Sequence, residues 1–247
     1  MNARVLHTLE YDKILEILKT HLASAMGEEE ANALHPVSDL AAAERMLQET
    51  EEAESVYRRT GRTPIEGFPD MRDTLRRIHA ALALSAGELL QIAQCLRVSR
   101  SAREILQDGD AQGLLSVLAN RLSSHRSVEE EITRCILSED EIADNASPAL
   151  ARIRRQMRLT NEKMREKLNN MIKSPTYQKY LQEPIITVRN GRFALPVKAE
   201  HRAQVQGLIH DASGSGQTLF IEPAAAVELG NEFRRLQSEE QTEIGRI

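Results

Sequence analysis

Residues 210–218 include several side chains of the kinds that enzymes use. His210 and Asp211 precede Ser213 and Ser215, so the segment holds the residue types of a hydrolytic triad. A triad needs these groups to converge in space, whereas neighbouring strand residues point to opposite faces, and no nucleophile elbow is present. We therefore interpret His210 as a structural or backbone-contacting residue and expect no catalytic residue here.

The same segment, Ser213-Gly-Ser-Gly-Gln-Thr, is superficially like a phosphate-binding loop. A Walker A loop has the pattern GxxxxGK[ST], because its lysine contacts the phosphates and its hydroxyl group binds magnesium. No lysine occurs in this segment, and both flanks are rich in β-forming residues. We therefore predict a hairpin turn.

The acidic residues and the cysteines are the candidates for metal ligands and paired carboxylates. The glutamate runs 28–30 and 129–131 lie at expected helix starts, where the helix dipole and solvent stabilise them. Cys95 and Cys135 are far apart, and no Cys/His cluster has metal-binding spacing. We expect buried, reduced thiols, no metal site and no bound cofactor in this segment.

Basic residues gather between residues 149 and 182. This stretch holds nine Lys/Arg and two acidic residues, a net charge of +7, so the remainder carries −12 within the overall −5. Spacings of three residues place Arg152, Arg155 and Arg158 on one helix face. Two roles stay open for this charge: pairing with acidic helices of the same chain, or contact with phosphates.

The composition predicts a mainly α fold. Of 247 residues only 3% are aromatic, and tryptophan is absent, whereas all-β domains usually contain more aromatic and β-branched residues. The chain has no apolar run of membrane-spanning length, and its first residues, MNARVLHTLEYDK, lack the apolar core that is typical of a signal sequence. We expect a cytoplasmic protein that does not enter the membrane.

Apolar periodicity and capping residues predict a series of helices before residue 147. Ser24 and Ser38 are expected to cap helices, Gly61 to close one, and Ser127 with Glu130 to form a capping box. Residues 138–147 are expected to form an acidic connector. The predicted helices cover 9–22, a short segment after Ser24, 39–60, 70–81, 86–107, 112–124 and a short segment after Ser127.

Ser147-Pro148 is the clearest helix start, because serine supplies the cap oxygen and proline suits the first helical position. An apolar stripe follows at nearly heptad spacing, with Thr160 and Lys167 as polar exceptions. About 25 helical residues would span roughly 37 Å. Ser174-Pro175 repeats the signal and is expected to start a shorter helix that ends near residue 182.

The chain changes to β character after residue 183. Asn190-Gly191 between two β-prone runs predicts a hairpin within 185–198, and residues 205–222 predict a second strand pair. A returning helix is expected over 224–247. Its apolar stripe stops in mid-pattern at Ile247, so we expect the chain to be part of a longer protein.

Basic residues beside the predicted hairpin are candidates for contact with a nucleic-acid backbone. Arg189 and Arg192 flank the turn and are expected to project from it. No aromatic residues interleave with the basic ones, so phosphate contact is favoured over stacking on bases. The candidate binding residues are Arg189, Arg192, Lys198, Arg202, Arg155 and Arg158.

Three segments resemble a known family. Residues 192–237 (RFALPVKAEHRAQVQGLIHDASGSGQTLFIEPAAAVELGNEFRRLQ) are similar to the signature region of the second subfamily of bacterial MutS-like proteins. Residues 9–27 resemble its N-terminus and residues 145–158 its long helix. The resemblance covers essentially the whole chain.

The resemblance implies a multi-helical core and lever region, a long helix leading to a small antiparallel β clamp element, and a returning helix. By this resemblance residues 1–146 would be the core/lever domain, 147–182 the basic arm, 183–223 the clamp element and 224–247 the returning helix. Members of the family are dimerising ATPases that bind ATP and Mg²⁺, often with a C-terminal Smr nuclease. Those functions would lie outside this segment, and a homodimer would form through the ATPase domain.

The resemblance also implies ligands, namely branched or recombining DNA and collided ribosomes with their RNA. A second hypothesis is a helical scaffold that docks on a protein or a ribosome without touching nucleic acid. Positive charge converging on the β tip would favour the first, and exposed apolar residues around Leu208, Leu219 or Phe220 would favour the second. A third, a stand-alone enzyme, needs a pocket with convergent polar groups.

Overall fold

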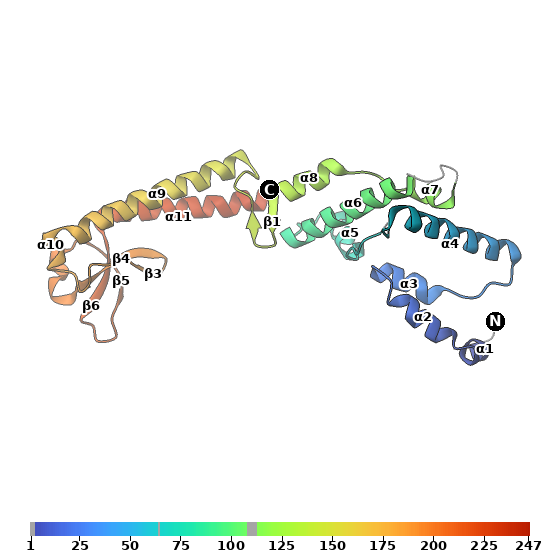
Figure 1. Ribbon diagram of the computed structural model, residues 1–247. Coiled ribbons are helices and arrows are strands. Elements are labelled where there is room, and N and C mark those ends of the chain that lie inside the picture. Colours follow the sequence, from blue (N-terminus) through green and yellow to red (C-terminus); the bar gives the residue numbers. More distant parts are fainter. Residues whose placement is uncertain (1–2, 64, 108–112) are drawn as a thin grey trace. The chain divides into compact units, whose positions relative to one another are not determined.

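A computed structural model describes residues 3–63, 65–107 and 113–247. The chain is mainly α, as predicted, and it divides into two compact units, Met1–Ala143 and Asp144–Ile247 (Figure 1). Among the described residues, no helix combines the length and apolar character that crossing a membrane requires.

The first unit is built from short and medium helices. Their order is α1 (Ala3–Thr8), α2 (Tyr11–Lys19), α3 (Ala25–Ala33), α4 (Leu40–Thr60), α5 (Arg72–His79), α6 (Ala86–Gln107), α7 (Leu114–Ala119) and α8 (Arg126–Cys135). Helix α6 packs against α4, α7 and α8, and it buries Ala93, Val98, Ala102 and Leu106. Val56, Leu106 and Ala119 form the small core that joins α4, α6 and α7.

Several boundaries in this unit differ from the prediction. The expected helix 9–22 is shorter in the structure, where α2 covers Tyr11–Lys19, and a separate helix, α1, precedes it. Glu10, between α1 and α2, adopts a left-handed conformation with φ of 56°. Asp39, and not Ser38, caps α4 by accepting a hydrogen bond from the Ala42 N–H at 2.8 Å. Ser24 and Gly61 act as predicted at the start of α3 and the end of α4.

Two further predictions in this unit were wrong. Helix α8 begins at Arg126, so Ser127 lies inside the helix and forms no capping box. The expected connector 138–147 includes part of a small hairpin formed by β1 (Ile136–Ser138) and β2 (Glu141–Ile142). Helix α7 is shorter than the predicted 112–124, of which residue 112 lies outside the described residues.

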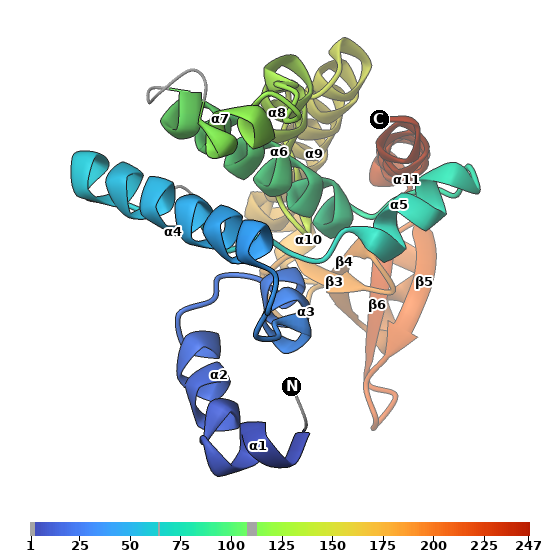
Figure 2. The ribbon, with the colours of Figure 1, turned by 90° about the vertical axis from the view of Figure 1, so that its right-hand side faces the viewer.

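The second unit is an antiparallel helix pair with a sheet at one end. Helix α9 (Pro148–Lys173) starts as predicted, because the Ser147 hydroxyl accepts a hydrogen bond from the Leu150 N–H at 3.0 Å. It packs along α11 (Ala224–Arg246), burying Leu150, Ile153, Met164 and Leu168. Figures 1 and 2 show the sheet on one side of this pair, at the end where α9 finishes.

A four-stranded antiparallel sheet follows α10 (Pro175–Gln178). Its strands are β3 (Thr187–Arg189), β4 (Arg192–Lys198), β5 (Gly207–Ala212) and β6 (Thr218–Pro223), in the spatial order β3-β4-β6-β5. The 3-10 helix η1 (Ala199–Gln204) connects β4 to β5. Both predicted strand pairs are present, and pairing of β4 with β6 joins them into one sheet.

One face of the sheet closes the core of the second unit. Leu195 and Val197 on β4 and Ile221 on β6 are fully buried against Met164 and Leu168 of α9. Alternation along β4 and β6 sends Arg192, Lys198, Phe220 and Glu222 to the other face. This second face carries most of the side chains considered below.

Candidate nucleic-acid interface

The β3–β4 turn has the conformation predicted for Asn190-Gly191. Asn190 and Gly191 have φ values of 50° and 71°, which a tight hairpin turn with two left-handed residues requires. The turn is also held from outside: the Asn190 side chain donates to the His210 carbonyl oxygen at 3.0 Å, and Arg234 of α11 donates to the Asn190 carbonyl oxygen at 2.7 Å. The turn is therefore a fixed part of the sheet.

Arg192 does not project from the turn, contrary to the prediction. Its side chain is only 13% exposed and contacts the Glu222 carboxylate at 3.3 Å and the Asn231 side chain at 2.7 Å. Register explains the direction, because Arg192 lies on the same face of β4 as Ala194 and Pro196, next to β6 and the start of α11. It joins strand to helix within the protein.

Glu222 is the centre of this arrangement, and sequence reasoning missed it. The residue is fully buried, and its second carboxylate oxygen lies 2.7 Å from His210 Nε2 on β5. We call Arg192, His210, Glu222 and Asn231 the Glu222 cluster. The absence of a side chain at Gly230 of α11 makes room for it, because a Cβ there would lie 2.4 Å from Glu222 Oε1 and 2.6 Å from Arg192 Nη1.

Arg202 also points inward. Its guanidinium donates to the carbonyl oxygens of Val205 and Gly207 at 3.1 and 3.2 Å, so it fixes the connection from η1 to β5. Lys198 is half-buried, and its backbone N–H donates to the Tyr180 carbonyl oxygen at 2.9 Å. Within the described residues its ammonium group has no hydrogen bond or ion pair.

Arg189 is the candidate nearest the surface of the turn. Its guanidinium carbon lies 4.1 Å from the centre of the Phe220 ring, and its Nε lies 3.3 Å from the Asp211 carboxylate. The side chain is 40% exposed. Of the two arginines that flank the turn, Arg189 thus keeps access to solvent.

On α9 the structure separates two sets of basic residues. Arg154 pairs with Asp144 at 2.7 Å and with Glu240 of α11 at 2.6 Å, and Arg158 pairs with Asp144 at 3.0 Å. These contacts support the internal role that the sequence left open. Arg155 is exposed, and within the described residues its side chain has no hydrogen bond or ion pair. The same holds for the side chains of Lys163, Lys173 and Lys179.

The base of the helix pair is a cluster of charged and capping groups. Besides capping α9, the Ser147 hydroxyl donates to Glu243 of α11 at 2.6 Å, and Arg246 also binds Glu243. Arg246 and then Ser147 lower the pKa of Glu243 to about 2, and Arg154 with Arg158 lowers the pKa of Asp144. These groups fix the register of α9 against α11.

Acid is expected to weaken this base cluster. A carboxylate whose pKa is lowered by folding stabilises the folded state above its ordinary pKa of 4.5 and loses that contribution as pH falls towards 2. The wild-type chain should therefore exceed a Glu243→Gln variant in urea midpoint at neutral pH, and the gap should shrink below pH 4.5. Far-UV circular dichroism measures both midpoints, and a gap that persists unchanged in acid would contradict the assignment.

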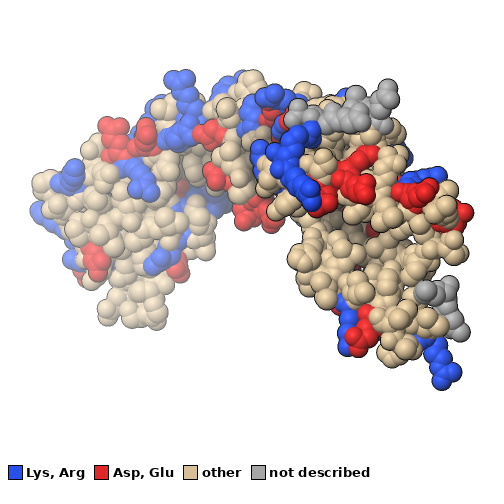
Figure 3. All heavy atoms as spheres, turned by 45° about the vertical axis from the view of Figure 1, so that its right-hand side comes forward, with Lys and Arg blue, Asp and Glu red and all other residues tan. Residues whose placement is uncertain are grey.

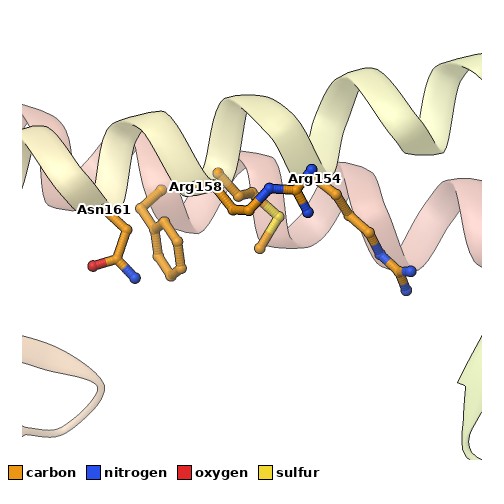
Figure 4. Close-up of a pocket in the computed structure, with 5 residues that line it drawn as sticks. Arg154, Arg158 and Asn161 are labelled. Atoms are coloured by element: carbon orange, nitrogen blue, oxygen red, sulfur yellow. The ribbon is translucent and has the colours of Figure 1, made fainter. Parts of the chain in front are cut away.

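A hollow of about 210 Å³ lies along the helix pair, lined by Arg154, Met157, Arg158, Asn161 and Phe233. Figure 4 shows that Arg154, Arg158 and Asn161 all come from α9 and line up along one side of it. Arg154 and Arg158 both form ion pairs with Asp144, so these charged groups hold α9 in place. Among the described residues no group of three or more His, Cys, Asp or Glu is placed to hold a metal ion, and Cys95 and Cys135 form no disulfide.

Comparison with known proteins gives the family. No family model matches the chain. Proteins described as endonuclease MutS2 match all of it: the relative from Acetivibrio thermocellus is 45% identical over 251 residues, that from Clostridioides difficile 43% over 251, and that from a Geobacillus species 40% over 251. The chain spans about a third (32%) of the length of each. Identity at this level over the whole chain places it in the second subfamily of MutS-like proteins, the MutS2 family.

Proposed function

We propose that this chain is a non-catalytic core/lever and clamp segment that binds a nucleic-acid backbone. It would act within a MutS-like ATPase on branched or recombining DNA, on collided ribosomes, or on both. The ATP, Mg²⁺ and dimer contacts that such an ATPase needs would belong to other parts of the longer protein. The relatives are named endonucleases, and we propose no nuclease site among these residues.

The observation that carries the proposal is a set of cations without internal partners in the second unit. This unit holds 16 Lys/Arg against 12 Asp/Glu, a net charge of +4, whereas the first unit carries −9. Most of its arginines are used internally. Within the described residues, the side chains without a hydrogen bond or ion pair include Arg155, Lys163, Lys173, Lys179 and Lys198. We call these five the unpaired cations.

The unpaired cations form an extended series. From Arg155 to Lys173 they follow α9 over 18 residues, which is roughly 27 Å of helix. Lys179 and Lys198 lie at the far end of α9, where Tyr180 and Lys198 are joined through their backbones. On the face shown in Figure 3, blue and red atoms alternate over the surface without merging into one positive field. A row of single cations suits a ligand that is itself a line of phosphate charges.

Replacing three lysines at the end of the arm tests the proposal. Lys173→Gln, Lys179→Gln and Lys198→Gln together should weaken binding to duplex DNA, branched DNA and a ribosomal RNA fragment alike. Each lost phosphate contact lowers the slope of log affinity against log salt by about 1, so the triple variant should lose about 3. Fluorescence anisotropy across a salt series measures the slope.

A matched control replaces three exposed arginines of the first unit that already have acidic partners. Arg58, Arg76 and Arg126 are exposed but paired with Glu54, Asp73 and Glu130. Changing these three arginines to Gln alters the net charge by the same amount and should leave the slope unchanged. Equal effects of both triple variants would mean that only overall charge matters, and no effect of either would refute backbone binding by this chain.

Docking on a protein partner remains the second candidate, because the sheet exposes apolar side chains at both edges. Leu208 and Ile209 on β5 are 52% and 48% exposed, and Val188 on β3 is 55% exposed. Such side chains favour a protein surface over a phosphate backbone. Binding to intact ribosomes that survives high salt, and that is lost in a Leu208→Ser, Ile209→Ser variant, would support this candidate.

A further inference from the structure

The Arg189 guanidinium forms a fixed flat surface on the second face of the sheet. Phe220 covers one side of it, with 4.1 Å between the guanidinium carbon and the ring centre. Its edge is held by Asp211, 3.3 Å from Nε, and by the Val188 carbonyl oxygen, which accepts from Nη1 at 3.1 Å. Because guanidinium donors lie in its plane, these edge contacts set the orientation of that plane.

Strand pairing explains why these three residues meet. Asp211 is the partner of Phe220 in the β5–β6 register, and an irregularity between Ile209 and Asp211 shifts the alternation of β5 there. Arg189 reaches the same place because the turn after it is tied to His210 and to Arg234. The backbone positions of Arg189, Asp211 and Phe220 therefore place the three side chains within reach of one another.

This setting suits a planar ligand better than a phosphate. Asp211 offsets the charge of Arg189, which weakens attraction for an anion, while the Arg189 side chain remains 40% exposed. Bases that are not stacked in a helix bind on arginine planes and aromatic rings, and every base offers such a face. The aromatic residue that stacking needs, which the sequence pattern did not reveal, lies directly beneath the arginine.

We infer that Arg189, supported by Phe220 and Asp211, is a stacking site for one unpaired nucleobase. This stacking site rests on the proposed function, nucleic-acid binding, and specifies which nucleic-acid structures the chain would prefer. The unpaired cations bind phosphates of any nucleic acid, whereas Arg189 favours strands with an accessible base, as at a branch, a loop or an end. DNA and RNA share this chemistry, and the experiment treats them as separate arms.

An abasic strand isolates stacking from charge, because it keeps every phosphate and lacks the bases. The full chain should bind a single-stranded oligonucleotide about tenfold tighter than an abasic strand of the same length. Arg189→Lys keeps the charge and loses the plane, so it should bind both strands alike, at the abasic affinity. Phe220→Leu removes the supporting ring and should reduce the preference to a similar extent. Each measurement is made with DNA and with RNA strands.

Arg235→Lys is the matched control, because Arg235 is an exposed arginine of α11 that pairs with Glu232 and Glu239. It should keep the full preference. A preference for base-bearing strands that is seen with only DNA or only RNA supports the stacking site and identifies that nucleic acid as its ligand. Salt-dependent binding with no preference for bases, or a preference that Arg189→Lys retains, overturns the stacking site and leaves backbone binding standing. Absence of binding to every strand refutes both.

Discussion

Replacing Glu222 with leucine is expected to destabilise the second unit by about 3–5 kcal/mol. The variant leaves Arg192, which is 13% exposed, without its carboxylate, and it removes the partner of His210 at 2.7 Å. A buried charge that loses its partner costs far more than the pair contributes. Hydrogen exchange of peptides within 207–223 measures the loss locally, which matters because a chain of two units need not unfold in one step.

Two variants make this result specific. Glu200→Leu removes a glutamate whose side chain is 74% exposed on η1, and it should change stability by less than about 0.5 kcal/mol. Arg192→Leu together with Glu222→Leu removes both charges, so the double variant should be more stable than Glu222→Leu alone. The loss of stability in the double variant could instead equal the sum of the losses in Arg192→Leu and Glu222→Leu measured separately. In that case the destabilisation would arise from poorer packing and not from an unpaired charge.

The sequence predicted helix starts and turns correctly where they depend on interactions between residues close together in the chain. Ser147-Pro148 starts a helix because the cap oxygen and the proline act within four residues of each other. Asn190-Gly191 forms a hairpin turn because both residues tolerate positive φ. Capping was less certain where candidates adjoin, as at Ser38 and Asp39, since both residue types are favoured at the N-cap and the sequence alone does not say at which one the helix begins.

The candidate site was predicted less well, because side-chain direction depends on partners distant in sequence. Arg192 was expected to project because it borders a turn, but its direction is set by Glu222, 30 residues later, and by Asn231. Arg202 was expected at the surface, yet it serves the backbone of Val205 and Gly207. No periodic pattern marks Glu222, because one acidic residue at the end of a strand looks like a boundary.

The contacts of Arg189 with Phe220 and Asp211 could not be predicted from the sequence for the same reason. Phe220 and Asp211 are nine residues apart, and an irregularity in β5 determines that they face the same side. Counting alternation along β5 would place Asp211 with Ile209, on the opposite face from His210. The identity of the basic residues was thus readable from the sequence. Which of them pair inside the protein, which stack and which stay available required the register of the sheet.

Gly230→Ala is expected to be nearly as damaging as loss of Glu222, although it adds a single methyl group. The new Cβ would lie 2.4 Å from Glu222 Oε1 and 2.6 Å from Arg192 Nη1, so the ion pair or the helix must move. Overpacking of a buried site costs about 1–3 kcal/mol, and separation of a buried pair adds to it, which outweighs the roughly 1 kcal/mol that alanine gains over glycine in a helix.

Gly245→Ala on the same helix is the natural comparison, because a Cβ at that position meets no atom within 4 Å. It should stabilise α11 by up to about 1 kcal/mol, so two identical substitutions on one helix should have opposite signs. Hydrogen exchange should show faster opening of β6 and the start of α11 in Gly230→Ala, and unchanged or slower opening in Gly245→Ala. Stabilisation by both would mean that the sheet is not clamped to α11 through Glu222. Loss of the preference of Arg189 for base-bearing strands in Gly230→Ala would instead show that this clamp holds the binding face of the sheet in place.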